Sequence, residues 1–278
     1  MELLDRLIDL ALDEDLGPAG DVTTRALVSA DASGSAELWA KSPLVLAGTT
    51  AFARVFQHVD PTLKTEFVAQ DGQWIPKKAR MATVSGRLAS LLTGERTALN
   101  LIQRTSGIAT MTRAAVRAIG KGKLKLLDTR KTSPGMRALS KEAVRAGGGF
   151  NHRFGLFDGV LIKDNHIAAV GGSIGEAVRR AKANGPRLVR IEAEVTRLDQ
   201  IEEAIAAGAH ILLLDNMTDA QIAKAVKLVG GRAELEVSGN VSIQRLPRLA
   251  KLGVDYASMG ALTHSAPAAD LSLEIIAG

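Results

Sequence analysis

The second half of the chain repeats a strand, a polar turn and a helix, and this rhythm limits the fold more than any other feature. From about residue 108, short apolar runs alternate with helical stretches at a spacing of roughly 22 residues, which is typical of successive βα units. Strands with continuous apolar runs suit a buried parallel sheet. The expected strands are Lys123–Leu127, Gly159–Ile162, Leu188–Ala193, His210–Leu214, Ala233–Val237 and Asp255–Met259. The expected helices between them include Arg197–Ala207, Asp219–Val229 and Ile243–Leu252. Because a closed barrel of this kind has eight strands, we expect an incomplete or distorted α/β barrel over residues 108–265.

The first part of the chain has another pattern, which predicts a separate α+β domain over residues 1–107. Leucine and isoleucine recur at helical spacing in residues 3–12, and helical periodicity returns at Thr50–Val59 and Leu88–Arg104. The stretches that alternate apolar and polar residues, as half-buried strands do, are Ser35–Lys41, Leu63–Ala69 and Arg80–Gly86. The whole chain is therefore expected to be a two-domain protein of the α/β class.

Polar or glycine residues follow the expected strands of the second domain. Barrel enzymes place their sites at the carboxyl ends of the strands, so these segments should meet at one mouth. They are Asp128-Thr129-Arg130-Lys131, Lys163-Asp164-Asn165, Glu194, Asp215-Asn216, Ser238-Gly239-Asn240 and Met259-Gly260-Ala261. Barrels often bind phosphate in the loops after their final strands, so the last two segments are candidate phosphate loops. Ordinary turns use the same residue types, however.

A basic cluster after the first of these strands favours a small anionic ligand. Arg130 and Lys131 lie near a Pro-Gly pair, and His152 and Arg153 lie just after three consecutive glycines. Arginine forks suit planar carboxylates, and lysine suits phosphate as a point charge. From composition alone, a solvated basic face is the commoner explanation of such a cluster. The triple glycine is either a flexible loop or a tight turn that presents His152 and Arg153.

Composition narrows the kind of partner. The chain has a net charge of +5 but only 3% aromatic residues, which leaves few stacking platforms for nucleic acid. It has no cysteine, which excludes disulfides and cysteine-bound metals. No apolar run approaches about 20 residues, so no membrane span is expected. The amphipathic, acidic first residues are unlike a secretory signal, and we expect a cytoplasmic protein that binds an anionic metabolite.

Glu194 and Asp215 stand at the ends of two successive strands and could hold a cation. Mg²⁺ prefers oxygen ligands and often shares its site with substrate phosphates. The alternative is that either carboxylate caps the following helix, because Asp is a preferred N-cap residue. Both are candidate Mg²⁺ ligands, which would bind the ion directly or through water.

Longer blocks of sequence resemble one enzyme family. Residues 128–135 read D-T-R-K-T-S-P-G, residues 143–153 read A-V-R-A-G-G-G-F-N-H-R, and residues 161–166 read L-I-K-D-N-H. With E-A-E-V at 192–195, E-V-S-G-N at 236–240 and G-A-L-T-H-S at 260–265, the chain resembles quinolinate phosphoribosyltransferase over nearly its whole length. This family is also called nicotinate-nucleotide pyrophosphorylase (carboxylating). Ala146 stands where many members have Cys, and Phe154 and Phe157 stand where Leu or Met and Tyr are common.

The resemblance implies an N-terminal α+β sandwich domain followed by an incomplete parallel α/β barrel. It implies that residues 266–278 return to the first domain, and that the protein is a homodimer or a higher oligomer. Arg96, which on sequence alone could be a plain surface residue, would then reach the site of the neighbouring subunit.

The implied reaction transfers phosphoribose from 5-phosphoribosyl 1-pyrophosphate to quinolinate, with loss of pyrophosphate and CO2. Its product, nicotinate mononucleotide, belongs to de novo NAD synthesis. The groups implied to grip the two carboxylates, next to Thr129, are Arg96, Arg130, His152 and Arg153. Lys131 and Lys163 would lie between quinolinate and the pyrophosphate, while Glu194 and Asp215 would meet the ribose hydroxyls and Mg²⁺. The residues expected to act in catalysis are thus Lys131, Lys163, Glu194 and Asp215.

Two other functions fit parts of the pattern. A paralogous phosphoribosyltransferase with another acceptor would share the fold. Such relatives are expected to lose the K-D-N-H or the N-H-R block, and both blocks are intact here. A non-catalytic sensor of phosphate ligands would not need Glu194 and Asp215 together with arginines that bind carboxylates.

Overall fold

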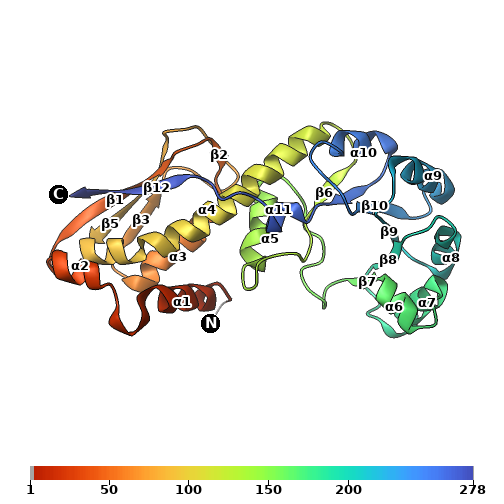
Figure 1. Cartoon of the computed structure of the whole chain (residues 1–278), viewed down its shortest axis with the longest axis horizontal. Coiled ribbons are helices and arrows are strands. Elements are labelled where there is room, and N and C mark those ends of the chain that lie inside the picture. Colours follow the sequence, from red (N-terminus) through yellow and green to blue (C-terminus); the bar gives the residue numbers. More distant parts are fainter. Residues whose placement is uncertain (1–2, 278) are drawn as a thin grey trace. The chain divides into compact units, whose positions relative to one another are not determined.

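The computed structural model describes residues 3–277, which fold into two compact units (Figure 1). Unit 1 contains the chain up to Arg113, the segment Thr132–Gly148 and the chain from Leu262 onward. Unit 2 contains Ala114–Lys131 and Gly149–Ala261. Unit 1 thus includes Thr132–Gly148, a segment that the sequence analysis assigned to the barrel domain. None of the helices in residues 3–277 is both long enough and apolar enough to cross a lipid bilayer.

Unit 1 is built on a four-stranded antiparallel sheet, in the order β12-β1-β5-β3. Its strands are β1 (Ser33–Ala40), β3 (Lys64–Phe67), β5 (Arg80–Arg87) and β12 (Leu271–Ala277). Alternate residues of β1 are buried, as expected for a strand with one face on a core. β12 pairs with β1 and places Leu273 opposite Leu38, so the C-terminal residues lie against the first domain, as the resemblance implied.

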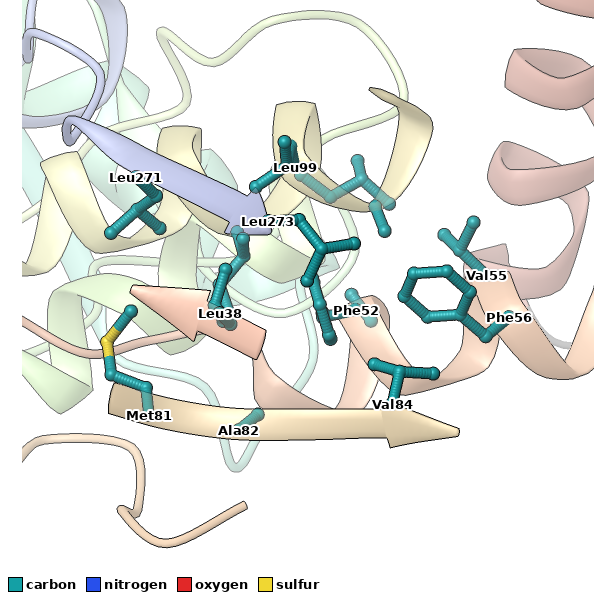
Figure 2. Packing of buried hydrophobic residues seen from close by; sticks show 14 of the residues in the cluster. Leu38, Phe52, Val55, Phe56, Met81, Ala82, Val84, Leu99, Leu271 and Leu273 are labelled. Atoms are coloured by element: carbon teal, nitrogen blue, oxygen red, sulfur yellow. The ribbon is translucent and has the colours of Figure 1, made fainter. Parts of the chain in front are cut away.

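Helices cover the apolar face of this sheet. The buried side chains of α3 (Thr49–Val59) pack against Leu38 and Val84 of the sheet and against Leu99 of the long helix α4 (Leu88–Ile119), as Figure 2 shows. The Phe52 and Phe56 rings meet edge to face, with their centroids 5.2 Å apart. The first helix, α1 (Leu3–Leu16), adds Ile8 and Leu12 to the same core. The remaining elements of this part of the chain are η1 (Gly17–Ala19), α2 (Val22–Leu27), β2 (Leu44–Val45), β4 (Trp74–Ile75), α5 (Arg137–Ala146) and α11 (Ala261–His264).

The expectation that the helix starting at Leu88 ends near Arg104 is wrong, because α4 runs on to Ile119 as one helix of 32 residues. A Cβ atom on Gly107 would lie 2.0 Å from the main-chain oxygen of Pro267. Glycine is therefore needed there for the close approach of another segment, and it does not end the helix. The Thr112 hydroxyl donates to the Ile108 carbonyl at 2.8 Å, which satisfies a polar group inside the buried helix.

Unit 2 contains a six-stranded parallel sheet in the order β6-β11-β10-β9-β8-β7. Its strands are β6 (Lys125–Leu127), β7 (Val160–Ile162), β8 (Ile191–Val195), β9 (Ile211–Asp215), β10 (Glu234–Ser238) and β11 (Tyr256–Ser258). The intervening helices are α6 (Asp164–Ala169), α7 (Ile174–Asn184), α8 (Gln200–Ala207), α9 (Asp219–Val229) and α10 (Leu246–Leu252). β6 and β7 do not pair with each other within the described strands, and Leu127 of β6 instead forms a bridge with Phe150. The expected incomplete α/β barrel is confirmed.

The two faces of these strands differ in polarity. Ala193, Leu212 and Val237 are fully buried on the side that packs against the helices. Their neighbours in sequence point to the opposite face, because side chains alternate along a strand. On that face, β8 and β10 carry the glutamates Glu192 and Glu236, both of which are buried. The inner face of the open barrel therefore carries buried ionisable groups.

Candidate active site

A cavity of about 410 Å³ lies at the carboxyl ends of the strands of unit 2. It brings together nine of the residues singled out in the sequence, which come from six separate segments of the chain. They are Thr129, Arg130, Lys131, His152, Arg153, Lys163, Glu194, Asp215 and Ser238. The convergence has a simple cause, since parallel strands present their carboxyl ends at one edge of the sheet.

Two carboxylates face each other on one side of this cavity. Glu194 lies in β8, which extends two residues beyond the strand expected there, and Asp215 is the last residue of β9. Burial raises the pKa of the Glu194 carboxyl, and repulsion from Asp215 raises it further. The Lys163 Nζ atom lies 3.9 Å from Glu194 Oε2 and opposes that shift. A second cation between the carboxylates would relieve the remaining repulsion.

Two guanidinium groups lie on another side. The Nε atoms of Arg130 and Arg153 are buried and make no hydrogen bond with any residue that the structure describes. Burial lowers the pKa of Arg153, and repulsion from Arg130 lowers it further. One Arg153 Nη1–H is held by the Gly159 carbonyl at 2.9 Å. Two neighbouring arginines with buried, unused Nε–H donors suit a ligand that carries planar anionic groups.

His152 is fixed between these arginines and the barrel interior. The buried Asp128 accepts a hydrogen bond from the His152 backbone N–H at 3.0 Å. The imidazole Nδ1 accepts the Arg153 backbone N–H at 2.7 Å, and Nε2 lies 2.9 Å from Glu192 Oε2. These contacts assign the ring proton to Nε2, where Glu192 accepts it. The short turn after the glycine triplet therefore holds the histidine in one orientation.

Two further glutamates adjoin the site and were missed from the sequence: Glu236 lines the cavity, and Glu192 contacts His152. Glu236 Oε2 lies 3.7 Å from His152 Nε2. Burial, followed by repulsion from Glu192, raises the pKa of Glu236 to about 8. The available signal was their place inside otherwise apolar strands, where a charge is costly unless it is paired or protonated.

Two groups of residues could hold a cation. The side-chain donors of His152, Glu192 and Glu236 all lie within 4.8 Å of one another. His152 already pairs with Glu192 there, and the raised pKa of Glu236, about 8, favours its neutral form at neutral pH. Glu194 and Asp215 offer only oxygen atoms, at the mouth of the cavity, where an ion could keep its waters. This second pair is therefore the better fit for Mg²⁺.

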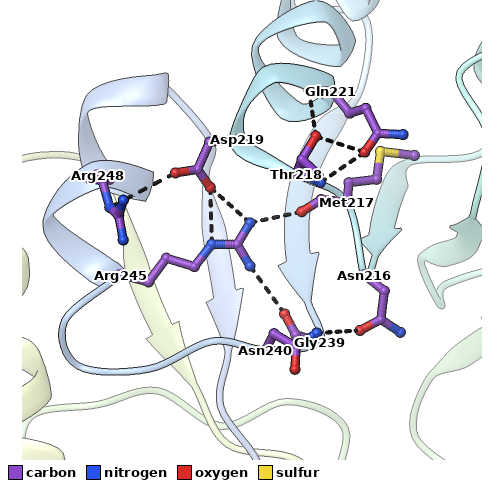
Figure 3. Close-up of polar contacts among 9 residues, drawn as sticks. All are labelled: Asn216, Met217, Thr218, Asp219, Gln221, Gly239, Asn240, Arg245 and Arg248. Atoms are coloured by element: carbon purple, nitrogen blue, oxygen red, sulfur yellow. Dashed lines mark hydrogen bonds and ion pairs between the residues drawn. The ribbon is translucent and has the colours of Figure 1, made fainter.

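The loops after β9 and β10 adopt an unusual backbone conformation. Asn216, Gly239 and Asn240 have φ values of 53°, 81° and 51°, in the left-handed region. The Asn240 side-chain amide donates to Asn216 Oδ1 at 3.2 Å, which joins the two loops (Figure 3). A Cβ atom on Gly239 would lie 2.2 Å from that same oxygen, so only glycine fits.

The other expected site residues are placed as follows. Met259, which is buried, and Gly260 follow β11, and Ala261 begins α11. Arg96 is an exposed residue of α4 in unit 1. His166 supports Lys163, because its Nδ1 accepts the Lys163 backbone N–H at 2.9 Å.

Known families and structures match this chain along most of its length. The C-terminal domain of quinolinate phosphoribosyl transferase matches residues 108–274, and the N-terminal domain of the same family matches residues 21–106. The chain belongs to the quinolinate phosphoribosyltransferase family. The boundary between the two family domains falls within α4.

Individual relatives agree with this assignment. The probable nicotinate-nucleotide pyrophosphorylase [carboxylating] of Bacillus subtilis is 43% identical, over 98% of this chain and 93% of the relative. A chloroplastic nicotinate-nucleotide pyrophosphorylase [carboxylating] of Arabidopsis thaliana is 40% identical, over 98% of this chain and 82% of the relative. The crystal structure of NadC from Streptococcus pyogenes is 42% identical and superposes with a TM-score of 0.93, over 98% of this chain and 96% of the other. A nicotinate-nucleotide pyrophosphorylase from Pyrococcus furiosus, at 17% identity and a TM-score of 0.69, shares the fold.

Proposed function

We propose that this protein transfers phosphoribose from 5-phosphoribosyl 1-pyrophosphate to the ring nitrogen of quinolinate. The products are nicotinate mononucleotide, pyrophosphate and CO2, in a step of NAD biosynthesis. The main structural support is one cavity lined both by two arginines with buried, unpaired Nε atoms and by two strand-end carboxylates. Such a cavity offers separate places for a dicarboxylate and for a sugar phosphate with its metal ion. The cytoplasmic setting expected from the sequence is part of this proposal.

The acceptor would bind on the arginine side. Arg130 and Arg153 would each direct N–H groups at one carboxylate of quinolinate, with Thr129 and His152 beside them. A ligand with a single carboxylate would leave one of these arginines without an anionic partner and its buried Nε–H unsatisfied, and that loss is costly. This side of the cavity therefore favours quinolinate over nicotinate.

The donor would bind on the carboxylate side. Glu194 and Asp215 would hold Mg²⁺, which when bound supplies charge that offsets the pyrophosphate. The same two carboxylates lie where ribose hydroxyls could donate to them. Lys131 and Lys163 would lie between the two substrates and stabilise negative charge on the departing pyrophosphate. The backbone at Ser238-Gly239-Asn240, with Met259-Gly260-Ala261, would bind the 5′-phosphate.

The reaction needs no nucleophilic side chain. The pyridine nitrogen attacks ribose C1, while the bond from C1 to the pyrophosphate oxygen breaks and its electron pair leaves with pyrophosphate. The transition state is oxocarbenium-like, as in other glycosyl transfers. The bond between ring carbon 2 and its carboxylate then breaks, and the electron pair stays on that carbon beside the cationic nitrogen until a proton arrives. The protein contributes by holding the two substrates in line.

A homodimer belongs to the same proposal. Arg96 is exposed on α4, so its guanidinium is available to another subunit. In a dimer, it would complete the cation set around quinolinate in the partner's cavity.

Calorimetric titration of two variants would test this division of the site. Removing one charged partner of a desolvated contact costs about 2–5 kcal/mol, so Arg153→Ala should weaken quinolinate binding by roughly 30-fold or more. Its affinity for the phosphoribosyl donor should change much less. Asp215→Asn should show the opposite preference, with a defect that grows at limiting Mg²⁺. Arg197→Ala removes an exposed arginine of unit 2 and should leave both affinities unchanged. Equal loss of both ligands in both folded variants would contradict the division.

A further inference from the structure

One arginine outside the cavity connects the loop after β9 with the loop after β10, which carries the proposed phosphate-binding residues Ser238-Gly239-Asn240. Arg245 precedes α10, and its side chain is only 14% exposed. Its Nη2 donates to the Met217 carbonyl at 2.8 Å, and its Nη1 donates to the Gly239 carbonyl at 3.3 Å. Figure 3 shows the guanidinium between these two loops, which follow β9 and β10.

Asp219 offsets the cost of removing the Arg245 guanidinium from water. Its Oδ1 accepts from Arg245 Nε at 3.0 Å and from Nη2 at 2.9 Å, so the buried cation has a carboxylate partner. An arginine can satisfy a carboxylate and still donate to two carbonyls because its five N–H groups lie in one rigid plane. A lysine ammonium at the end of a flexible chain cannot span the same three acceptors.

The carbonyl contact also fixes an amide group. The Gly239 carbonyl and the Asn240 N–H belong to one planar trans peptide, in which the two groups point in opposite directions. When Arg245 holds the carbonyl, it therefore holds the Asn240 N–H on the side facing away from Arg245. Asn240 itself has a left-handed φ of 51°, a conformation that glycine and asparagine adopt more readily than other residues. Consecutive left-handed or turn residues can form an anion-binding concavity of N–H groups.

We infer that Arg245 is a positioning residue for the phosphoribosyl donor, acting through the Gly239–Asn240 peptide and the Met217 carbonyl without touching substrate. This inference rests on the proposed function for the identity of the donor. It predicts a defect confined to one substrate, whereas a purely structural role would affect both substrates or only stability.

Three variants test the inference. Arg245→Met removes the hydrogen bonds to the two carbonyls while keeping an apolar chain of similar length. Arg245→Lys keeps the positive charge but removes the planar guanidinium group. Arg248→Met is the matched control. Arg248 lies in α10, three residues after Arg245, and its Nε atom is 3.9 Å from Oδ2 of the same Asp219, but its side chain is 70% exposed. Binding of 5-phosphoribosyl 1-pyrophosphate with Mg²⁺, and of quinolinate, would be measured separately by calorimetry, with melting temperature as the check on folding.

We expect Arg245→Met to raise the donor Kd at least about tenfold, since one net hydrogen bond to a charged group is worth about 1.5–3 kcal/mol. The Kd of Arg245→Met for quinolinate should stay within about twofold of the parent's value. Arg245→Lys should resemble Arg245→Met more than the parent, and Arg248→Met should resemble the parent. If Arg245→Met does not fold, Arg245→Lys carries the test alone.

Unchanged donor affinity in a folded Arg245 variant would overturn the inference, as would equal loss of both substrates. An equal donor defect in Arg248→Met would also overturn it, because general charge around Asp219 would then be the cause. Donor binding is measured without turnover. If the parent protein binds the donor but does not convert quinolinate, the proposed reaction is refuted. The effect of the Arg245 variants on donor affinity can still be measured in that case.

Discussion

Replacing Gly239 with alanine should disable donor binding far more than it destabilises the fold. The residue has a φ of 81°, and placing alanine in this left-handed region costs about 1–2 kcal/mol. The added Cβ would also lie 2.2 Å from Asn216 Oδ1 and 3.0 Å from the Asn216 backbone nitrogen. The side-chain oxygen must retreat by roughly 1 Å to reach van der Waals distance, and the backbone must move with it.

A shift of this size matters because Asn216 and Gly239 belong to the loops that would hold the donor. Misplacing binding groups by about 1 Å can cost about 100-fold in rate. We therefore expect kcat/KM for the phosphoribosyl donor to fall by about 100-fold, with quinolinate binding preserved. Steady-state kinetics with varied donor would measure the rate, and urea unfolding would measure the stability.

Gly231→Ala provides the matched control. Gly231 has a φ of 80°, nearly that of Gly239, but a Cβ there would meet no atom within 4 Å. The free energy of unfolding of Gly231→Ala should fall by about 1–2 kcal/mol, while its activity stays at the parent's level. If the two variants lose activity equally, or if Gly239→Ala keeps its donor affinity, the reasoning from the close contact with Asn216 is refuted.

Two further predictions concern charge and assembly. The folded-state pKa of Glu236 is about 8, above its ordinary value of 4.5, so the folded protein keeps a proton that the unfolded chain releases. Its contribution to stability is therefore complete below about pH 4.5 and is lost as the pH rises toward 8. Glu236→Gln, with the facing groups His152 and Glu192 unchanged, should reduce this loss of unfolding free energy, measured by urea unfolding at pH 5 and 9. A change in unfolding free energy with pH equal to the parent's would contradict the prediction. If Arg96 completes the partner's cavity, mixing inactive Arg96→Ala and Lys131→Ala proteins should restore part of the activity, because one cavity of each heterodimer carries neither lesion. No recovery, with subunit exchange verified by mass spectrometry, would restrict Arg96 to its own chain.

Much of the fold and of the site was predictable from local sequence pattern. The strands of unit 2 were found because they are short, mainly apolar runs between polar turns, and the site residues were found because polar segments follow those strands. The conclusion that Lys163, Asp215 and Ser238 meet in one cavity needed only the rule that parallel strands end at one edge.

The rest depended on contacts between distant segments. The reason for a glycine at position 107 inside α4 is the close main chain at Pro267, which is far away in sequence. The arrangement of Glu192 and Glu236 around His152 requires the register of separate strands, and a lone glutamate in an apolar run does not reveal it. The hydrogen bonds of Arg245 to the Met217 and Gly239 carbonyls could not be predicted from the sequence either, because an arginine before a short helix is usually a surface residue.

Turnover of labelled quinolinate tests the central claim most directly. Quinolinate carrying ¹³C in its 2-carboxylate would be incubated with the protein, 5-phosphoribosyl 1-pyrophosphate and Mg²⁺, and a parallel reaction would contain nicotinate. The proposed function predicts labelled CO2, pyrophosphate and nicotinate mononucleotide in equal amounts. Nicotinate should react at least about 100-fold more slowly, because it leaves one arginine of the site without a carboxylate partner. Equal turnover of the two acids, or pyrophosphate release without labelled CO2, would contradict it.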